Sequence, residues 1–253
     1  MLKILVSGAC GKMGKAVCAC ALEKGYTVAC GVDACGKENA SFPVYPGFSD
    51  VKEKVDVIVD FSRPELLGDL MAFAEKTKTP CVIATTGLNE VQKARLQELS
   101  KTVSVFYSAN FSLGVSVLCA LCRRAAKALK DEFDIEILEK HHRQKVDAPS
   151  GTALMIADAI SSVLDEKPEY VFDRSKKSSP RAKEEIGFSS VRGGSIVGEH
   201  DVIFAGDQEV LTVSHSAADR AIFASGALKA AQFLVGQKPG FYTMDSMLEA
   251  LGL

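Results

Sequence analysis

Short apolar runs rich in β-branched residues alternate with helical patterns over the first hundred residues. The runs are Lys3–Ser7, Thr27–Val32, Val55–Phe61, Pro80–Thr85 and Val103–Tyr107, and apolar residues recur at helical spacing over Met13–Lys24, Pro64–Lys76 and Asn89–Ser100. Because parallel strands require a crossover that is usually a helix, this alternation is typical of an α/β domain. We therefore predict a doubly wound parallel sheet with helices on both faces.

The pattern changes from about Val115 onward. The expected elements are a helix over Val115–Lys130, a strand over Phe133–His142, a helix that starts near Ser150, and a hairpin of two alternating runs, His200–Ala205 and Glu209–Ser214. They predict a second, α+β domain with a mixed sheet over residues 113–221. Helical patterns over Ala221–Val235 and Asp245–Leu251 return the chain to the first domain, which then spans 1–112 plus 222–253.

Composition narrows the class of protein. With 47% hydrophobic and 25% charged residues and no long unbroken apolar stretch, the chain is expected to be neither disordered nor membrane-bound. A formal net charge of −2 gives no general attraction for nucleic acid, so an anionic ligand must be held by a local basic cluster. The Ser/Lys/Arg-rich stretch Arg174–Glu185 is expected to be a surface loop that orders when a ligand binds.

The eight cysteines raise the question of disulfides. Five of them lie in apolar segments that resemble helices or strands: Cys18, Cys20, Cys30, Cys81 and Cys119. The amino terminus predicts a buried strand rather than an export signal, so we expect reduced thiols in a cytoplasmic protein. Cys119 and Cys122 form a C-x-x-C, but no second pair or nearby histidine completes a zinc set, and we predict no metal site.

The strand Lys3–Ser7 runs directly into a glycine-rich turn that opens a helix. Gly8, Ala9, Cys10, Gly11, Lys12 and Met13, followed by Gly14, form a G-x-x-G-x-x-G variant of the dinucleotide-binding turn. Glycines let the backbone approach a pyrophosphate, and the N–H groups at the start of the helix bind it. The alternative is a plain glycine-rich connection between a strand and a helix.

Asp33 lies near the end of the next strand, about twenty residues beyond the turn, where an acidic residue accepts a hydrogen bond from a ribose 2′-hydroxyl. An acidic group at this point repels a 2′-phosphate, so we expect NADH to be used at least as well as NADPH. Lys12, Lys15 and Lys37 could partly offset this charge, which leaves the choice of cofactor open. The alternative for Asp33 is an ordinary loop carboxylate.

Short, mostly polar segments, called strand tips below, also follow the later predicted strands of this half. Ligands of such sheets bind at the carboxyl ends of the strands. The residues expected there are Ala84, Thr85, Thr86, Ser108, Ala109, Asn110 and Phe111. Short polar tips suit the nicotinamide and its ribose, although each of these residues is alternatively a simple turn residue.

The segment Glu139–Ala153 concentrates cationic side chains just before a capped helix. His141 and His142 are adjacent at a strand end and face opposite sides, so one imidazole can point at a ligand while the other braces it from the rim. Lys145 suits a carboxylate, and Ser150–Thr152 offers N–H groups at a helix start to another. The residues alone indicate a site for a small dianion, the alternative being a solvated basic strand end.

The run E-x-H-H-R-x-K-V-D-A-P-S-G-T-A in this segment closely resembles the signature of the 4-hydroxy-tetrahydrodipicolinate reductase family, historically called dihydrodipicolinate reductase. Other family-like motifs follow in the same order along nearly the whole chain: G-x-x-G-K-M-G, D-F-S-R-P, T-T-G, A-N-F-S-L-G-V, S-V-R-G-G-S-I-V-G-E-H, S-H-S-A-x-D-R and G-F-Y-T-M. The resemblance implies a Rossmann-like domain built from both chain ends and an inserted α+β domain whose sheet assembles a homotetramer.

The resemblance also implies a reaction and a set of residues. Hydride passes from NADH or NADPH to the ring of a small dicarboxylate, and loss of water gives tetrahydrodipicolinate in lysine and diaminopimelate biosynthesis. His141 matches the proton donor, and Lys145 matches the group that holds a substrate carboxylate and is also described as a donor. The matching substrate contacts are His142, Ser150, Gly151, Thr152 and, more loosely, Arg220.

The nucleotide contacts implied by the resemblance coincide with the turn and tips described above, from Gly8 through Met13, at Asp33, at Thr85 and Thr86, and from Ser108 through Phe111. Ala84 departs from the family, which usually has glycine before T-T-G, and its methyl group crowds a close backbone approach. His200 and His215 are expected to serve packing or loop hydrogen bonds. Two other functions stay open: a two-domain nicotinamide dehydrogenase of another carboxylate-bearing amino-acid precursor, and a nucleotide-binding sensor without catalysis.

Overall fold

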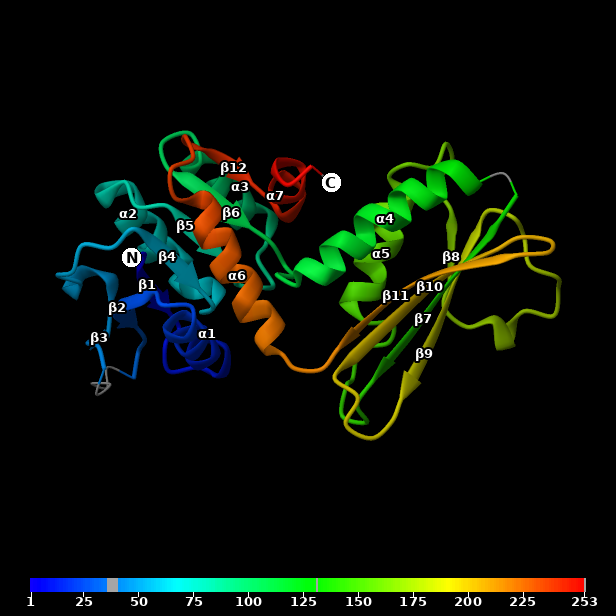
Figure 1. The fold of residues 1–253 in the computed structure, drawn as a ribbon, viewed down its shortest axis with the longest axis horizontal. Coiled ribbons are helices and arrows are strands. Elements are labelled where there is room, and N and C mark those ends of the chain that lie inside the picture. The colour runs from blue at the N-terminus through cyan, green and yellow to red at the C-terminus, as the bar shows by residue number, and fades with distance from the viewer. Residues whose placement is uncertain (36–40, 131, 253) are drawn as a thin grey trace. The chain divides into compact units, whose positions relative to one another are not determined.

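The computed structural model describes residues 1–35, 41–130 and 132–252. Lys37, one of the lysines that bear on cofactor choice, lies outside the described residues. The chain forms two units, one of Met1–Leu113 with Ala221–Gly252 and one of Gly114–Arg220 (Figure 1).

The first unit holds a parallel sheet that has seven strands within the described residues, in the order β12-β6-β5-β4-β1-β2-β3. Its strands are β1 (Lys3–Ser7), β2 (Thr27–Val32), β3 (Val44–Tyr45), β4 (Val57–Asp60), β5 (Cys81–Ile83), β6 (Ser104–Tyr107) and β12 (Gly240–Tyr242). The order of the first six strands reverses direction beside β1, as in doubly wound dinucleotide-binding sheets. The predicted α/β class is confirmed.

Helices cover both faces of this sheet, which explains why its central strands are apolar throughout. The helices are α1 (Lys12–Glu23), α2 (Leu67–Thr77), α3 (Glu90–Leu99), α6 (Ala221–Leu234) and α7 (Met244–Ala250). One core joins β1 and β4 to α1 and α6, and the other joins the opposite faces of these strands to α2 and α3. Capping side chains define helix starts, for example Asn89, which accepts a hydrogen bond from the Gln92 N–H at 2.9 Å.

The second unit is built on a mixed sheet in the order β11-β10-β7-β9-β8. Its strands are β7 (Asp134–His141), β8 (Glu169–Val171), β9 (Glu185–Arg192), β10 (Gly198–Ala205) and β11 (Val210–Ala217). Strands β10 and β11 form the predicted antiparallel hairpin, whereas β7, β9 and β8 pair in parallel. This confirms the expected second mixed sheet.

Helices α4 (Leu113–Leu129) and α5 (Gly151–Ser161) cover one face of the mixed sheet. Burial therefore alternates along β7 and β10, with Ile135 and Ile137 facing the helices and Glu136 facing the opposite side. Glu139 and His141 continue the helix-facing row of β7. The strand thus carries two polar residues into the buried side of the unit, which sets up the site described below.

The basic stretch Arg174–Glu185 is only partly the surface loop that the sequence indicates. A short 3-10 turn covers Arg174–Lys176, and Glu185 is a buried residue at the start of β9. Arg174 and Lys177 pair with Glu185, while Arg181 hydrogen-bonds Asp134 and Glu136. Carboxylates of the same unit neutralise these cations, so we do not expect them to bind an anionic ligand.

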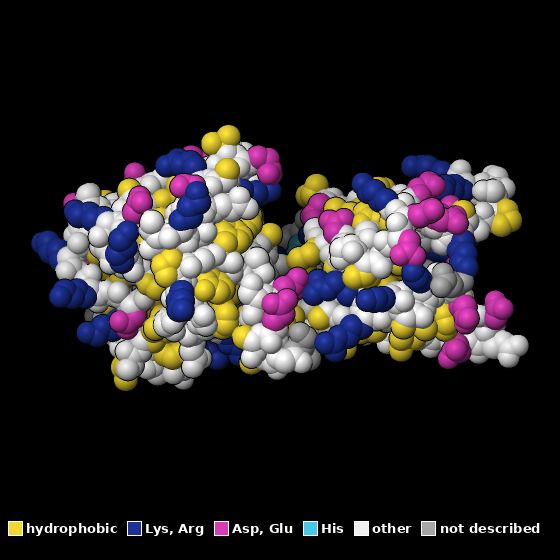
Figure 2. All heavy atoms as spheres, turned by 90° about the horizontal axis from the view of Figure 1, so that it is seen from above, with side chains coloured by type: hydrophobic (Ala, Val, Ile, Leu, Met, Phe, Trp, Pro, Cys, Tyr) yellow, Lys and Arg dark blue, Asp and Glu magenta, His cyan; other side chains and the backbone are white. Residues whose placement is uncertain are grey.

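Acidic and basic side chains both occur on the surface. Figure 2 shows acidic and basic side chains interspersed on the face it presents, in keeping with the small net charge. Among the described residues, no helix is both long and apolar enough to cross a bilayer.

Candidate active site

The glycine-rich turn joins β1 to α1 in the first unit. Gly8 has a φ of +78°, and its N–H donates to the Val32 carbonyl at 2.8 Å, which ties the turn to the end of β2. A Cβ at Gly8 would lie 2.7 Å from the Phe61 carbonyl oxygen, and one at Gly14 would collide with the carbonyl oxygen of Gly8. Only glycine fits these positions, so the backbone stays uncovered for a pyrophosphate at the start of α1.

Asp33 follows β2 and lies against this turn. Its carboxylate accepts hydrogen bonds from the Cys10 N–H at 3.0 Å and the Cys35 N–H at 3.2 Å. A carboxylate has room for about four hydrogen bonds, so ribose hydroxyls can still bind it. The turn and Asp33 therefore fit a dinucleotide, as the sequence indicates.

Cys10 and Cys35 are joined as a disulfide, and their Cα atoms are 7.1 Å apart. The expectation of reduced thiols is wrong for this pair, because the fold brings Cys35, two residues after Asp33, back to the glycine turn. The remaining six cysteines are thiols, and Cys119 and Cys122 of the C-x-x-C are both buried in the second unit.

The other expected cofactor residues lie at the carboxyl ends of β5 and β6. Thr85 is buried and donates its hydroxyl hydrogen bond to Asp60 at 2.6 Å, while Thr86 is exposed. Burial raises the pKa of the Asp60 carboxyl, although hydrogen bonds from Ser62 and Thr85 oppose the shift. Asp60 thus holds the loop after β5 in place, a role that the sequence did not reveal.

The loop after β6 is folded on itself. Ser108 donates to the Asn110 carbonyl at 2.7 Å, and Asn110 accepts from the Ser112 N–H at 2.8 Å. Phe111 is buried against Phe61 and Phe106, and its carbonyl oxygen packs against Gly226 of α6. Ala84 is also buried, whereas Ala109 is exposed.

In the second unit, a buried carboxylate organises the end of β7. Glu139 is completely buried and accepts a hydrogen bond from His141 Nδ1 at 2.6 Å. Arg192, opposite His141 on β9, binds the same carboxylate through both terminal nitrogens, at 2.8 and 2.7 Å. A paired guanidinium and a histidine N–H together compensate a charge that would be costly to bury alone.

Protonation at this site is set by burial and by these contacts. Burial alone would raise the pKa of Glu139, but hydrogen bonds from Arg192, Ser190 and His141 hold it at about 2. Burial lowers the pKa of His141, and the hydrogen bond to Glu139 opposes only part of that shift. At neutral pH His141 is therefore neutral, with Nδ1–H directed at Glu139 and the Nε2 lone pair available.

The start of α5 is tied to the same carboxylate. The Ser150 N–H donates to Glu139 at 3.2 Å, and the Ser150 hydroxyl caps the helix by accepting from the Ala153 N–H at 3.1 Å. His200 Nε2 lies 3.0 Å from that hydroxyl, and its ring stands edge-on to His141. Burial, followed by the neighbouring His141, lowers the pKa of His200 to about 4.

Lys145 lies in the loop between β7 and α5. Its ammonium group pairs with the Asp147 carboxylate at 2.8 and 2.9 Å, and Lys145 lowers the pKa of Asp147. Arg192 donates to the Asp147 carbonyl at 2.6 Å, so the guanidinium that holds Glu139 also holds this loop. The peptide bond between Ala148 and Pro149 is cis.

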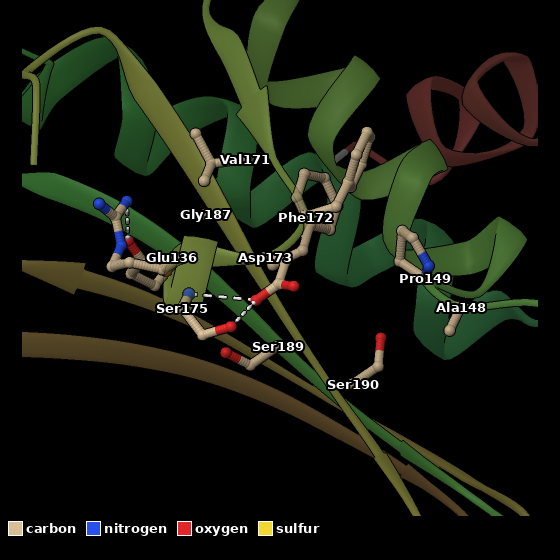
Figure 3. A pocket seen from close by; sticks show the side chains of 12 residues that line it. Glu136, Ala148, Pro149, Val171, Phe172, Asp173, Ser175, Gly187, Ser189 and Ser190 are labelled. Atoms are coloured by element: carbon tan, nitrogen blue, oxygen red, sulfur yellow. Dashed lines mark hydrogen bonds and ion pairs between the residues drawn. The ribbon is translucent and has the colours of Figure 1, made fainter. Parts of the chain in front are cut away.

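Two cavities flank this segment. His142 and Arg220, whose nitrogens lie 3.4 Å apart, line one of about 630 Å³ together with Ser195. The other, of about 450 Å³, has Ser189 and Ser190 along one side and Pro149 nearby (Figure 3).

The expected substrate residues fall into three groups in this unit. Glu139 brings His141 together with Ser150, Lys145 stands on the adjoining loop, and His142 with Arg220 lines the larger cavity. Gly151 is exposed and Thr152 half-buried in the first turn of α5.

Glu139, Arg192 and His200 complete the site, and the sequence reasoning assigned them no role in it. Glu139 has a detectable signal, because residues two apart on a strand share a face and Glu139 precedes His141 by two. Arg192 and His200 lie within the family-like run S-V-R-G-G-S-I-V-G-E-H, but β9 was not predicted, so nothing placed Arg192 beside Glu139.

The parallel sheet with its glycine turn, joined to a unit that carries a histidine–carboxylate pair, defines a pyridine-nucleotide-dependent oxidoreductase. Family models for the N-terminus and the C-terminus of dihydrodipicolinate reductase match residues 2–111 and 114–248. The chain belongs to the dihydrodipicolinate reductase family, which confirms the resemblance drawn from its motifs.

Individual relatives agree. The chain is 54% identical over 250 residues to a 4-hydroxy-tetrahydrodipicolinate reductase of Caldanaerobacter subterraneus subsp. tengcongensis, covering 98% of this chain and 99% of that one. It is 44% identical over 251 residues to the enzyme of the same name from Clostridium tetani, covering 99% and 98%. A dipicolinate-bound dihydrodipicolinate reductase from Paenisporosarcina sp. TG-14 shares the fold, with a TM-score of 0.81, 22% identity, and coverage of 96% and 97%.

Proposed function

We propose that this protein reduces 4-hydroxy-tetrahydrodipicolinate to tetrahydrodipicolinate in lysine and diaminopimelate biosynthesis. The substrate takes up one hydride and one proton and releases one water. The observation that carries the proposal is the end of β7, where the Glu139 carboxylate binds both the His141 ring and the Ser150 N–H at the start of α5. Lys145 lies in the loop between these two elements. The family membership and the names of the full-length relatives support the same reaction.

The second unit supplies the groups that a dicarboxylate ring needs. Lys145 binds one carboxylate by exchanging its partner Asp147 for the substrate, and the N–H groups of Gly151 and Thr152 at the start of α5 bind the other. His142 and Arg220 contact the ligand from the neighbouring cavity. The dipicolinate in the solved structure from Paenisporosarcina is a ligand of this kind.

His141 is the proton donor in this proposal. Two substrate carboxylates bring negative charge to a ring that burial keeps neutral, and so favour a proton on Nε2 in the complex. Glu139 stabilises the resulting imidazolium through Nδ1–H, as a buried carboxylate does for other catalytic histidines. Glu139 and Arg192 are therefore positioning residues, and His141 and Lys145 are the catalytic ones.

The first unit holds the nicotinamide cofactor, which supplies the hydride when bound. The contacts proposed for it are the turn Gly8, Ala9, Cys10, Gly11, Lys12 and Met13, the ribose acceptor Asp33, and the strand tips Ala84, Thr85, Thr86, Ser108, Ala109, Asn110 and Phe111. The proposal that NADH serves at least as well as NADPH is supported by Asp33, whose charge opposes a 2′-phosphate.

A turnover assay tests the function. Pure protein is mixed with NADH or NADPH and freshly generated 4-hydroxy-tetrahydrodipicolinate, and oxidation of the cofactor is followed against an enzyme-free control. We expect rapid oxidation with equimolar tetrahydrodipicolinate. Oxidation no faster than the control with either cofactor would remove the proposal, and a sensor without catalysis would bind cofactor but give this negative result.

We also propose a cytoplasmic homotetramer assembled through the mixed sheet. The sheet face opposite α4 and α5 presents Leu138, Val191 and Ile203 among paired charged residues such as Lys140 and Asp201. Apolar side chains on an outer sheet face favour burial against another subunit. Light scattering after size exclusion should give four times the chain mass for the wild type and a smaller mass for Ile203→Lys. A monomeric wild type would contradict this assembly.

A further inference from the structure

Two cysteine sulfurs lie beside the glycine turn and take no part in the reaction. The Cys10 and Cys35 sulfurs and an Asp33 carboxylate oxygen all lie within 4.8 Å of one another. Cys10 is half-buried and Cys35 is exposed, so small reagents can reach the pair. The two sulfurs are joined in a disulfide.

We propose that Cys10 and Cys35 are a reversible dithiol–disulfide pair that controls binding of the dinucleotide at Asp33. The inference rests on the proposed role of Asp33 as ribose acceptor. Both cysteines also donate their N–H groups to that carboxylate, so a link between their side chains fixes the backbone on both sides of it. The two sulfurs and a carboxylate oxygen of Asp33 lie within 4.8 Å of one another, so opening or closing the link changes the immediate surroundings of that carboxylate.

The redox step is ordinary thiol–disulfide exchange with a low-molecular-weight disulfide such as oxidised glutathione. One cysteine thiolate attacks the reagent and releases one glutathione thiol, and the second cysteine then attacks the mixed disulfide and releases the other. The protein loses two electrons and two protons, and the reagent gains them as two thiols. A dithiol such as dithiothreitol reverses the reaction.

Other cysteines are poor competitors for the oxidant. Cys18, Cys30, Cys81, Cys119 and Cys122 are buried, and burial raises the pKa of Cys18 to about 11 and of Cys30 to about 12. Cys20 on α1 is partly exposed and has no disulfide partner. Cys20 therefore serves as the control for oxidation of an accessible cysteine outside the pair.

The test measures cofactor binding without substrate. Full-length protein is reduced with dithiothreitol or oxidised in glutathione buffers, the Cys10–Cys35 link is mapped by peptide mass, and the Kd for NADH is measured by fluorescence. The disulfide form should bind NADH roughly 10- to 100-fold more weakly, the loss expected for one hydrogen bond to a charged group, and dithiothreitol should restore binding. Cys35→Ser should bind NADH like the reduced wild type in every buffer, and Cys20→Ser should respond like the wild type.

Several results would overturn the inference. The first is a mapped disulfide with unchanged NADH affinity, and the second is absence of the disulfide under oxidising conditions. The third is zinc that stays bound to Cys10, Asp33 and Cys35 in the reduced protein. Cys35→Ala serves if Cys35→Ser does not fold. Failure of the proposed function is recognised separately, because reduced wild-type protein would then bind no NADH or bind it without turning over substrate.

Discussion

At the scale of single residues, Glu139 is the feature on which the site depends most. It is the shared partner of His141, Arg192 and Ser150, so one carboxylate fixes the ring, the strand opposite and the start of α5. Replacing Glu139 therefore tests both the orientation and the protonation of His141. Arg192 would lose its partner inside the unit, so folding must be checked in every such variant.

We predict that Glu139→Gln lowers kcat by about 10- to 1,000-fold and moves the His141 limb of the pH–rate profile to lower pH. The carboxylate is the main influence that raises the pKa of His141 against burial, so its loss lets that pKa fall further. Glu136→Gln, on the opposite face of the same strand, is the control and should leave the profile in place. An unshifted profile in Glu139→Gln with native circular dichroism would refute the positioning role.

His200 gives a prediction about stability. Its pKa in the folded protein, about 4, lies below its unfolded value near 6.5, so the folded state binds fewer protons between these limits. Its contribution is present above pH 6.5 and is lost as the pH falls toward 4, by at most about 3 kcal/mol.

His200→Gln should therefore flatten the pH dependence of the free energy of unfolding between pH 4 and 6.5, as measured by urea titration. His141 and His215, whose pKa values burial also lowers, retain part of the slope. Equal slopes for variant and wild type would show that His200 does not titrate in this way.

At the scale of elements, the patterns of hydrophobicity located most of the fold. Strands β1 and β2 have the predicted bounds, and the hairpin of β10 and β11 follows the predicted alternation. Buried strands of a parallel sheet are apolar on both faces, and hairpin strands alternate, so both leave a readable signal.

The elements that the patterns missed share a physical cause. Strands β3, β8 and β12 are two or three residues long, too short for any period to show. Strand β9 contains Gly187 and a pair of serines, which lower its apparent strand propensity. The Cys10–Cys35 pair and the Arg192 contact to Glu139 depend on pairing across the chain, which no local pattern encodes.

The glycine turn gives the first prediction at this scale. Gly14→Ala should weaken NADH binding at least tenfold and lower the melting temperature, because the added methyl collides with the Gly8 carbonyl and must displace the start of α1. Gly68→Ala in α2 is the control, since a methyl there meets no atom and should stabilise the helix by roughly 0.5–1 kcal/mol. Binding by calorimetry separates the two. Wild-type affinity in Gly14→Ala would show that the turn does not hold the cofactor.

The proposed cofactor preference depends on Asp33, which follows β2. Asp33→Ser removes the charge that repels a 2′-phosphate and a hydrogen-bond acceptor for the ribose, so kcat/KM should fall for NADH and rise relative to it for NADPH. Paired kinetics with both cofactors measure this ratio. A wild type that strongly prefers NADPH, or an unchanged ratio in Asp33→Ser, would contradict the role given to Asp33.

At the scale of the whole molecule, the chain separates its tasks between two units. Each residue proposed for the cofactor lies in Met1–Leu113, and each residue proposed for the substrate lies in Gly114–Arg220. The chain leaves the first unit after β6 and returns at α6, which the change of pattern near Val115 and the closing helical segments both indicated. Variants of the two sets should therefore have separable effects, on cofactor affinity and on substrate turnover.

Lys145→Ala tests the central claim most directly. With saturating NADH, kcat/KM for 4-hydroxy-tetrahydrodipicolinate should fall about 10²- to 10⁴-fold while NADH affinity and melting temperature stay near wild type. Lys140→Ala is the matched control, because Lys140 lies five residues earlier and pairs with Glu199 and Asp201 away from the buried side of the sheet. A rate for Lys145→Ala within about twofold of that control would contradict the account.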